Sequence, residues 1–323
     1  MSLRCWTTTR EPEPGFVEAW SVRLARAPHA NFSLDPRYLR WEAEQGRGAI
    51  AGLVDEGGTG GAFVLRETAR GFVSGWPWRW QAVVEDPSRS GPSGLSADEC
   101  AWLLDRARRA VPGRDVRWYA PSPPVRWAPG FLAGSTVLYA VAREDDELVA
   151  GMNSTKRRMI RRAQKAGYTV REAHGEPDYR AFSALQHETK RRHGLEVTAV
   201  PEGDPGEGRH WREWELPWMW LLVAECEGRV ECGLGDGLCD GGQLEARAGA
   251  SSNRARQEGA FALLSYEEAR RARDRGYRWI NLGGASQFKV EFAGTLGSRV
   301  AVHSWLAGPA RRVLDRHGEA TWH

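Results

Sequence analysis

Helical and strand-like patterns alternate along this chain of 323 residues, and a similar order of elements occurs twice. In the first half, apolar residues recur at helical spacing over 15–26. Asp35 followed by Pro36 predicts the start of a second helix, over 35–44. Strand-like segments are expected at 49–54, 61–67, 75–84, 115–120 and 136–141, with a further helix at 97–110.

The second half repeats this series of helices and strands. It opens with a basic helix over 153–167, expected to be capped by Ser154 or Thr155 and ended by Gly167. The segments that follow are a helix at 178–192, strands at 218–226, 229–239 and 244–250, a helix at 262–276 and a strand at 278–284. We therefore predict an α/β protein made of two tandem copies of one fold, over 1–145 and 146–323. The last strand or helix could pack back on the first domain.

The composition is that of a globular protein outside membranes. Charged residues make up 27% of the chain and apolar residues 41%. No apolar run is long enough to cross a membrane, and the N-terminal segment lacks the apolar stretch of a secretory signal. We expect a cytoplasmic protein without membrane insertion.

The cysteines and histidines do not predict a metal site. The five cysteines form an odd set, and Cys226, Cys232 and Cys239 are separated by five and six residues, further apart than zinc ligands usually are. His187 and His193 are close in sequence but lack a third candidate ligand. We expect reduced thiols and no bound metal.

Arginine dominates the basic residues. Of 45 basic residues only four are lysine, and the net charge of +3 does not by itself indicate a nucleic-acid protein. The basic helix 153–167, however, repeats cations at spacings of three and four, which places them on overlapping faces. It predicts a phosphate-binding surface for a tRNA or a nucleotide diphosphate, with a merely solvated helix as the other interpretation. The residues concerned are Lys156, Arg158, Arg161, Arg162 and Lys165.

Three segments resemble the Fem aminoacyltransferases and the acetyltransferase-like (GNAT) superfamily that includes them. The first runs from TVLYAV through an acidic turn into the basic helix NSTKRRMIRRAQKAG, and the second from LEARAGASSN to RWINLGG. The third is GGASQFKVEFAG, which is similar to the Phe-Lys motif of that family. Together they cover roughly half of the chain, and their joint order is more specific than any one of them.

The resemblance implies two GNAT-like domains, each a mixed, largely antiparallel sheet flanked by helices. It also implies transfer of an amino acid from charged tRNA to an amine, with aminoacyl-tRNA as co-substrate and no other cofactor. We expect a small-molecule or peptide acceptor, an antibiotic or other secondary metabolite being favoured over a peptidoglycan precursor. Such a reaction passes through an oxyanion, which Lys289 of the Phe-Lys motif would stabilise while Phe288 packs beside it.

The acceptor site is expected to differ from that of other family members. Glu245 and Arg247 occupy positions where the family often has aromatic residues, and Glu245 is suited to hold a cationic amine. A cross-strand ion pair of no functional meaning is the other interpretation. Asn281 and Trp78 are further candidates for substrate binding. If a protein side chain acts as the base, the candidates are Glu245 and Asp236.

Two alternatives follow from the same sequence. The first is an acetyl-CoA-dependent N-acetyltransferase, whose pyrophosphate-binding signature fits Arg256-Gln257-Glu258-Gly259-Ala260 until Phe261, which is too large. The second is a non-catalytic protein that binds RNA through its basic helix. The sequence does not predict an oligomeric state.

Overall fold

The computed structural model of the chain divides into two compact units. Unit 1 holds the described residues up to Thr136 and from Leu296 onward, and unit 2 holds those within Val137–Cys239 and Gln243–Thr295. The first boundary thus lies before the predicted one, and 296–303 belongs to unit 1. The described residues are 2–25, 32–46, 48–56, 59–67, 80–83, 106, 117–121, 132–194, 212–239, 243–284, 286–292 and 295–303.

Unit 1 contains a four-stranded antiparallel sheet in the order β1-β2-β3-β4. β5 and β12 pair with each other, also antiparallel. The strands are β1 (Ser2–Thr7), β2 (Ala49–Glu56), β3 (Thr59–Glu67), β4 (Trp80–Val83), β5 (Arg117–Pro121), the first part of β6 (Leu132–Ala140) and β12 (Thr295–His303). The helices are α1 (Phe16–Ala25), the short 3-10 helix η1 (Phe32–Leu34) and α2 (Pro36–Glu44).

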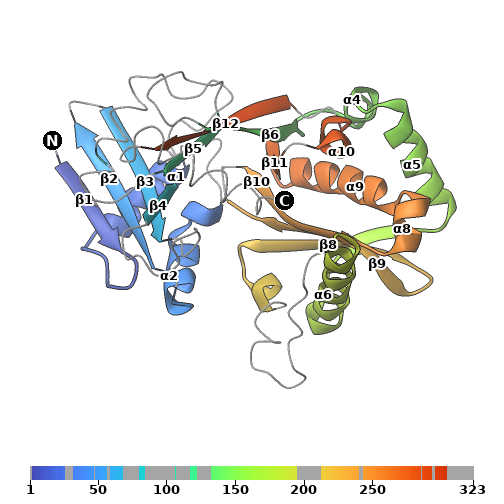
Figure 1. Cartoon of the computed structure of the whole chain (residues 1–323), viewed down its shortest axis with the longest axis horizontal. Helices are drawn as coiled ribbons and strands as arrows, with labels where there is room; N and C mark the ends of the chain where they lie inside the picture. The colour runs from blue at the N-terminus through green and yellow to red at the C-terminus, as the bar shows by residue number, and fades with distance from the viewer. Residues whose placement is uncertain are drawn as a thin grey trace. The chain divides into compact units, whose positions relative to one another are not determined.

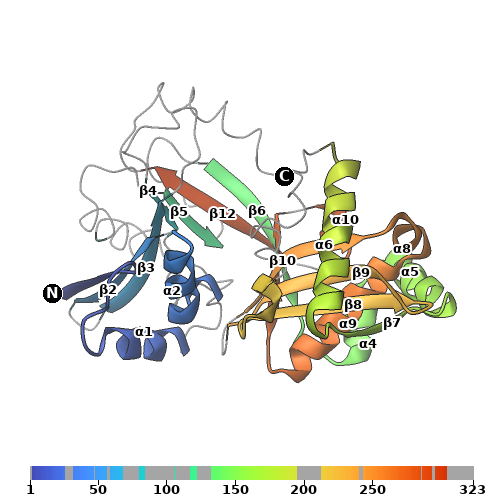
Figure 2. The ribbon, with the colours of Figure 1, turned by 90° about the horizontal axis from the view of Figure 1, so that it is seen from below.

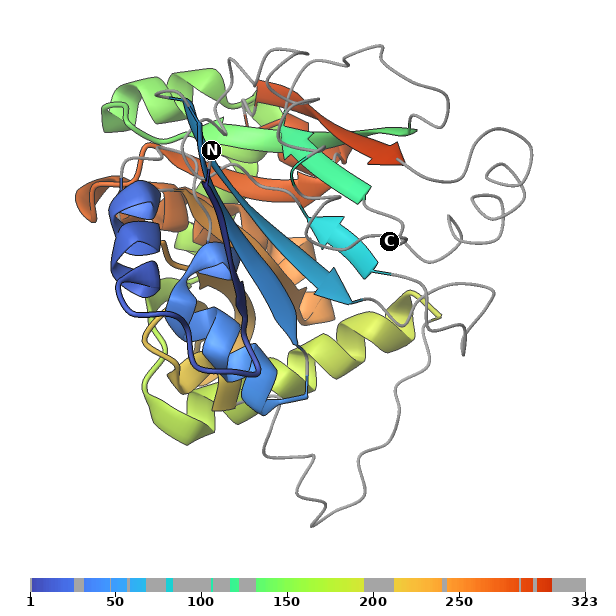
Figure 3. The ribbon, with the colours of Figure 1, turned by 90° about the vertical axis from the view of Figure 1, so that its left-hand side faces the viewer.

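The helices α1 and α2 follow the sequence pattern closely. α1 buries Phe16, Trp20 and Leu24, one turn apart, and lies beside the sheet of unit 1 (Figure 3). The Nε1 of Trp20 donates to the carbonyl of Leu34 at 2.8 Å, so the buried indole keeps a hydrogen-bond partner. Asp35 caps α2, accepting from the amide of Arg37 at 2.8 Å. Apolar spacing therefore defines α1, and a side-chain cap defines the start of α2.

Unit 2 contains a mixed, largely antiparallel sheet in the order β11-β10-β9-β8-β7, with the second part of β6 beside β11 (Figure 1). Only β10 and β11 are parallel among the described pairs from β7 to β11. The strands are β7 (Thr169–Glu172), β8 (Met219–Cys226), β9 (Arg229–Gly237), β10 (Leu244–Ser251) and β11 (Trp279–Gly284). The helices are α4 (Asp145–Gly151), α5 (Ser154–Lys165), α6 (Gly175–Arg192), the 3-10 helix η2 (Glu213–Glu215), α8 (Asn253–Glu258), α9 (Ala260–Asp274) and α10 (Gln287–Val290).

Helices cover both faces of this sheet. α9 lies on one face, with α5 packed against it, and α6 packs against β9 and β10 on the other (Figures 1 and 2). Two glycines of β9 leave room on this face: a side chain at Gly233 would overlap Phe182 of α6, and one at Gly235 would overlap Trp214 of η2. The predicted fold class, mixed α/β with helices flanking the sheet, is confirmed.

Two carboxyl groups lie inside the core between α9 and the sheet. Asp236 of β9 is fully buried and Glu268 of α9 is 1% exposed. Burial raises the pKa of Glu268 to about 7, and burial together with the charge of Glu268 raises the pKa of Asp236. Burial of Tyr139 on β6, together with the charge of Glu268, raises the pKa of its hydroxyl.

Several local predictions were wrong in detail. α5 is capped by Asn153, whose side chain accepts from the amide of Lys156 at 2.9 Å, rather than by Ser154 or Thr155. The helix predicted over 262–276 begins at Ala260 and is preceded by the separate helix α8, because Gly259 between them is left-handed with φ +83°. None of the described helices is both long and apolar enough to span a membrane.

Candidate functional site

A cavity of about 770 Å³ opens in unit 2 beyond the point where β10 and β11 stop pairing. The parallel ladder joins Leu244 to Ile280 and Glu245 to Asn281. Past this ladder, the cavity is lined by 249–251 of β10 on one side and by Ser286 and Phe288 after β11 on the other. α5, the end of α6, α8 and the start of α9 complete the lining. The cavity thus lies between β10 and the segment that follows β11, in a place that suits a ligand.

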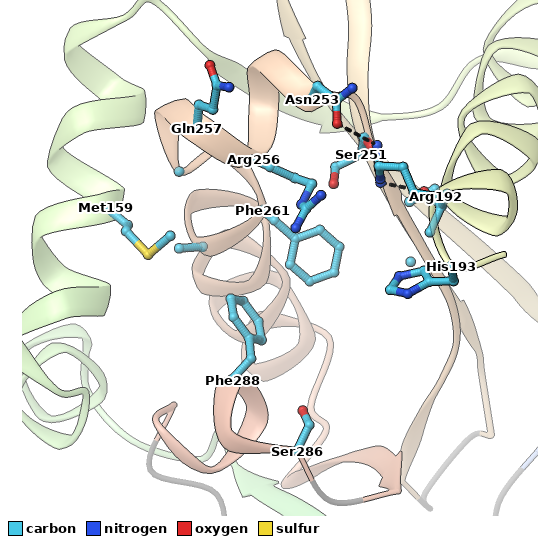
Figure 4. Close-up of a pocket in the computed structure, with 15 residues that line it drawn as sticks. Met159, Arg192, His193, Ser251, Asn253, Arg256, Gln257, Phe261, Ser286 and Phe288 are labelled. Atoms are coloured by element: carbon cyan, nitrogen blue, oxygen red, sulfur yellow. Dashed lines mark hydrogen bonds between the residues drawn. The ribbon is translucent and has the colours of Figure 1, made fainter. Parts of the chain in front are cut away.

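One wall of the cavity is apolar and aromatic. It is formed by Met159 of α5, Phe261 of α9 and Phe288 of α10. The rings of Phe261 and Phe288 lie edge to face, with centroids 5.4 Å apart, and both are turned into the cavity (Figure 4). This wall offers a surface for an alkyl chain or a flat ring.

The opposite wall is cationic. It carries Arg192 and His193 at the end of α6 and Arg256 on α8, and none of the described lining residues is acidic. Arg192 is held in place by hydrogen bonds to the carbonyl of Ser251 at 2.8 Å and to the Oδ1 of Asn253 at 3.3 Å (Figure 4). It also forms an ion pair with Glu188 of α6, at 3.0 Å. The arrangement suits a ligand that combines an anionic group with an apolar or planar part.

Gly259 fixes the path of the chain into α9. It is left-handed, and a Cβ there would lie 2.7 Å from the carbonyl oxygen of Met159 on α5. Glycine is therefore required both by the backbone angle and by the close approach of the two helices. Phe261, the residue that departs from the pyrophosphate-binding signature, places its ring in the cavity.

The Phe-Lys motif lies at the edge of this cavity. Ser286 caps α10, its hydroxyl accepting from the amide of Lys289 at 3.4 Å. Phe288 lines the cavity, whereas Lys289 is partly buried and is not among the lining residues. The two adjacent side chains therefore leave the short helix in different directions.

Four of the five predicted phosphate-binding residues are exposed on α5: Arg158, Arg161, Arg162 and Lys165. Arg162 also donates from Nη1 to the carbonyl of Gln257, at 2.8 Å, and so joins α5 to the cavity-lining helix α8. The prediction was wrong for Lys156, which is only 4% exposed and forms an ion pair with Glu291. An ammonium buried in this way is not part of a phosphate-binding surface.

The candidate acceptor residues lie together at the end of the parallel ladder. Glu245 and Asn281 are register partners on β10 and β11. The Oε2 of Glu245 is buried and has no hydrogen-bond partner among the residues that the structure describes. Arg247 forms an ion pair with Glu213, at 3.0 Å. Trp78 lies outside the described residues.

Asp236 and the cysteines lie away from this site. Asp236 is buried in the core with Glu268 and is not among the cavity-lining residues, so its position does not suit a base there. Cys226, Cys232 and Cys239 are buried free thiols. Within the described residues, no group of three or more His, Cys, Asp or Glu side chains could hold a metal ion.

The sequence interpretation missed the cationic wall. Arg192 and His193 end an ordinary amphipathic helix, and no local pattern distinguishes them from other residues in the last turn of a helix. Their role comes from the hydrogen bonds of Arg192 across to β10 and α8, which link segments about 60 residues apart. Only the tertiary structure brings these segments together.

Solved structures share this fold. FemX is similar over 93% of this chain and 97% of its own, with a TM-score of 0.66 and 13% identity. The C-terminal domain of a protein assigned as a lysylphosphatidylglycerol synthetase of Agrobacterium fabrum matches over 88% and 91%, with a TM-score of 0.54 and 16% identity. A conserved protein of unknown function from Bacteroides thetaiotaomicron matches over 88% and 96%, with a TM-score of 0.51 and 14% identity.

No protein-family model matches the sequence, and a search of curated proteins finds no match. The resemblance is therefore carried by structure, at identities too low to transfer an activity. The chain shares the fold of FemX.

Proposed function

We propose that this protein is an aminoacyltransferase that moves an amino acid from charged tRNA to the amine of a small-molecule or peptide acceptor. The observation that carries the proposal is the cavity of unit 2, with an aromatic wall facing a cationic one and the Phe-Lys motif at its edge. The resemblance of the Phe-Lys motif to that of the Fem aminoacyltransferases implies such a donor, and the fold is similar to that of FemX. No cofactor other than the charged tRNA takes part in this proposal.

The donor end of the tRNA would enter the cavity of unit 2. Its phosphate groups match Arg192 and Arg256, and its planar or apolar parts match Phe261 and Phe288. The exposed cations of α5 extend the positive surface from the cavity, since Arg162 contacts α8 directly. Long-range attraction of the tRNA to this surface would weaken as the salt concentration rises.

Lys289 would act on the oxyanion that forms when the amine attacks the ester carbonyl. An ammonium stabilises that charge as the carbon–oxygen bond to the tRNA ribose breaks. Glu245 is the candidate for holding the acceptor, because one of its carboxylate oxygens is buried without a partner in the described part of the chain. A cationic amine would satisfy that oxygen, which favours an aminated metabolite or short peptide over a phosphorylated precursor.

The test is a transfer assay with purified protein, charged tRNA and a panel of amines. Ribonuclease should abolish transfer. Lys289→Met should lower turnover at least a hundredfold with an unchanged melting temperature, because loss of one oxyanion donor costs about 10²–10³ in rate. The control is Lys190→Met, which makes the same change at an exposed lysine of α6. Near-normal turnover in Lys289→Met would remove the role assigned to it.

The second candidate function is acetyl transfer from acetyl-CoA. The observation in its favour is the left-handed Gly259 at the start of α9, at the expected place in the pyrophosphate-binding signature. The ring of Phe261 counts against it, because this residue replaces the small one of the signature and fills part of the cavity. Transfer from acetyl-CoA that resists ribonuclease would establish this alternative. Binding of tRNA without transfer to any amine would instead indicate an RNA-binding protein.

A further inference from the structure

Lys156 is a buried ammonium at the contact between α5 and α10. Its residue is 4% exposed, and its Nζ lies 3.0 Å from the Oε2 of Glu291. The same Nζ lies over the ring of Phe288, 3.7 Å from the centroid, and 5.8 Å from the centroid of Phe292. One cation is therefore held by a carboxylate and by the faces of two aromatic rings.

These contacts explain why the residue is lysine in a chain rich in arginine. A lysine presents a compact charge at the end of a flexible stem, so that it can reach a ring face and a carboxylate at once. The guanidinium of an arginine is larger and planar, and it would not fit the same enclosed space at the same distances. Lys156 is one of only four lysines among 45 basic residues.

The partners of Lys156 all belong to the segment that carries the Phe-Lys motif. Phe288 lies within α10, Glu291 is the residue that ends it, and Phe292 follows directly. The backbone adds a further link, since the amide of Asn153 at the start of α5 donates to the carbonyl of Glu291 at 3.2 Å. The ion pair with Lys156 holds the pKa of Glu291 below its usual range.

We propose that Lys156 is a positioning residue: it fixes α10 against α5 and thereby sets the place of Phe288 in the cavity wall and of Lys289 beside it. α10 has only four residues, too few to be stable by itself, so its position depends on such contacts. The effect of Lys156 on catalysis rests on the proposed function, whereas its role in holding α10 against α5 does not.

Hydrogen exchange of the full chain tests the structural part directly. In Lys156→Met, whose side chain is similar in length and can pack against the two rings, the amides of 289–292 should exchange at least tenfold faster. Amides of β8 and β9, strands that contain none of the three partners of Lys156, should keep their protection. Lys190→Met, with the same change at an exposed site, should alter neither region.

A second variant covers the case in which Lys156→Met does not fold. Glu291→Gln removes the charge of the partner at a partly exposed position, whose side chain is 23% exposed. It should also loosen 289–292, and the double variant should be no looser than Lys156→Met alone, because both changes break the same contact. Unchanged exchange at 289–292 in both single variants would overturn the inference.

Measurements of activity distinguish a failure of this inference from a failure of the proposed function. If the protein transfers aminoacyl groups, Lys156→Met should lower kcat about tenfold or more, and Lys156→Arg should not restore it although the charge is kept. Full activity in Lys156→Arg, with exchange as in the unchanged protein, would refute the need for a compact ammonium. If no variant and no unchanged protein transfers any acyl group, the proposed function fails while the exchange result still decides the role of Lys156.

Discussion

Replacement of Glu268 by glutamine should change how the stability of the protein depends on pH. Glu268 and Asp236 are buried together between α9 and the sheet, and neither oxygen of Asp236 has a hydrogen-bond partner among the described residues. Glutamine has almost the same shape as glutamic acid and stays neutral at every pH. The substitution therefore removes one ionisation while leaving the packing of the core in place.

The size of the effect follows from the pKa of Glu268, which burial raises from 4.5 to about 7. The folded state holds this proton more tightly than the unfolded state, so the stabilisation is complete below about pH 4.5 and is lost as pH rises towards 7. The loss amounts to about 3 kcal/mol in total, at up to ~1.4 kcal/mol for each pH unit. Glu268→Gln should remove this loss. The variant should be within about 1 kcal/mol of the unchanged protein at pH 5, where most of the stabilisation from Glu268 is still present, and about 3 kcal/mol more stable at pH 8.

Urea unfolding between pH 5 and 8, followed through the hydrogen exchange of α9 amides, measures the effect in unit 2 itself. Glu176→Gln, at a half-exposed position on α6, is the control and should keep the pH dependence of the unchanged protein. The reasoning would be refuted by a stability difference between Glu268→Gln and the unchanged protein that stays constant across this pH range.

Two further substitutions test the packing of unit 2. Gly259→Ala should lower the free energy of unfolding by about 2 kcal/mol or more, since the site combines a positive φ with a close approach to Met159. The control is Gly167→Ala, a site with a positive φ but open space around it. In thermal melts it should lower stability less. Asp178→Asn should cost roughly 2 kcal/mol at neutral pH, because Arg171 and the amide of His174 both donate to this carboxylate and lower its pKa. As the folded pKa is the lower one, that stabilisation is lost on acidification, so in urea unfolding the variant and the unchanged protein should converge below about pH 4.

Much of the secondary structure was predictable because it depends on local signals. The apolar spacing of α1 and the cap and proline of α2 place both helices within a residue or two of their observed bounds. Elements without such a signal were missed: α4 has one buried residue, and α10 has four residues that a sequence pattern does not distinguish from a turn. The boundary between the units depends on contacts between distant segments, which periodicity does not report.

The site was predictable only in part, for a physical reason that Lys156 illustrates. Six cations in α5 look alike in the sequence, and helical spacing predicts which of them share a face. It does not predict that Glu291, far along the chain, will pair with one of them and withdraw it from the surface. Glu245 and Asn281 were chosen separately, and only strand register shows that they are neighbours.

The early end of the parallel ladder between β10 and β11 has a consequence for ligand selection. An unpaired strand edge usually lies at the margin of a sheet, where any extended chain can add to it. In this protein, β10 beyond Glu245 instead borders a cavity whose lining includes two arginines and two phenylalanines. Main-chain groups of β10 would then form hydrogen bonds with an extended ligand whatever its side groups are. Discrimination between ligands would consequently depend on the side chains that line the cavity, and Phe261→Ala should broaden the range of molecules that bind.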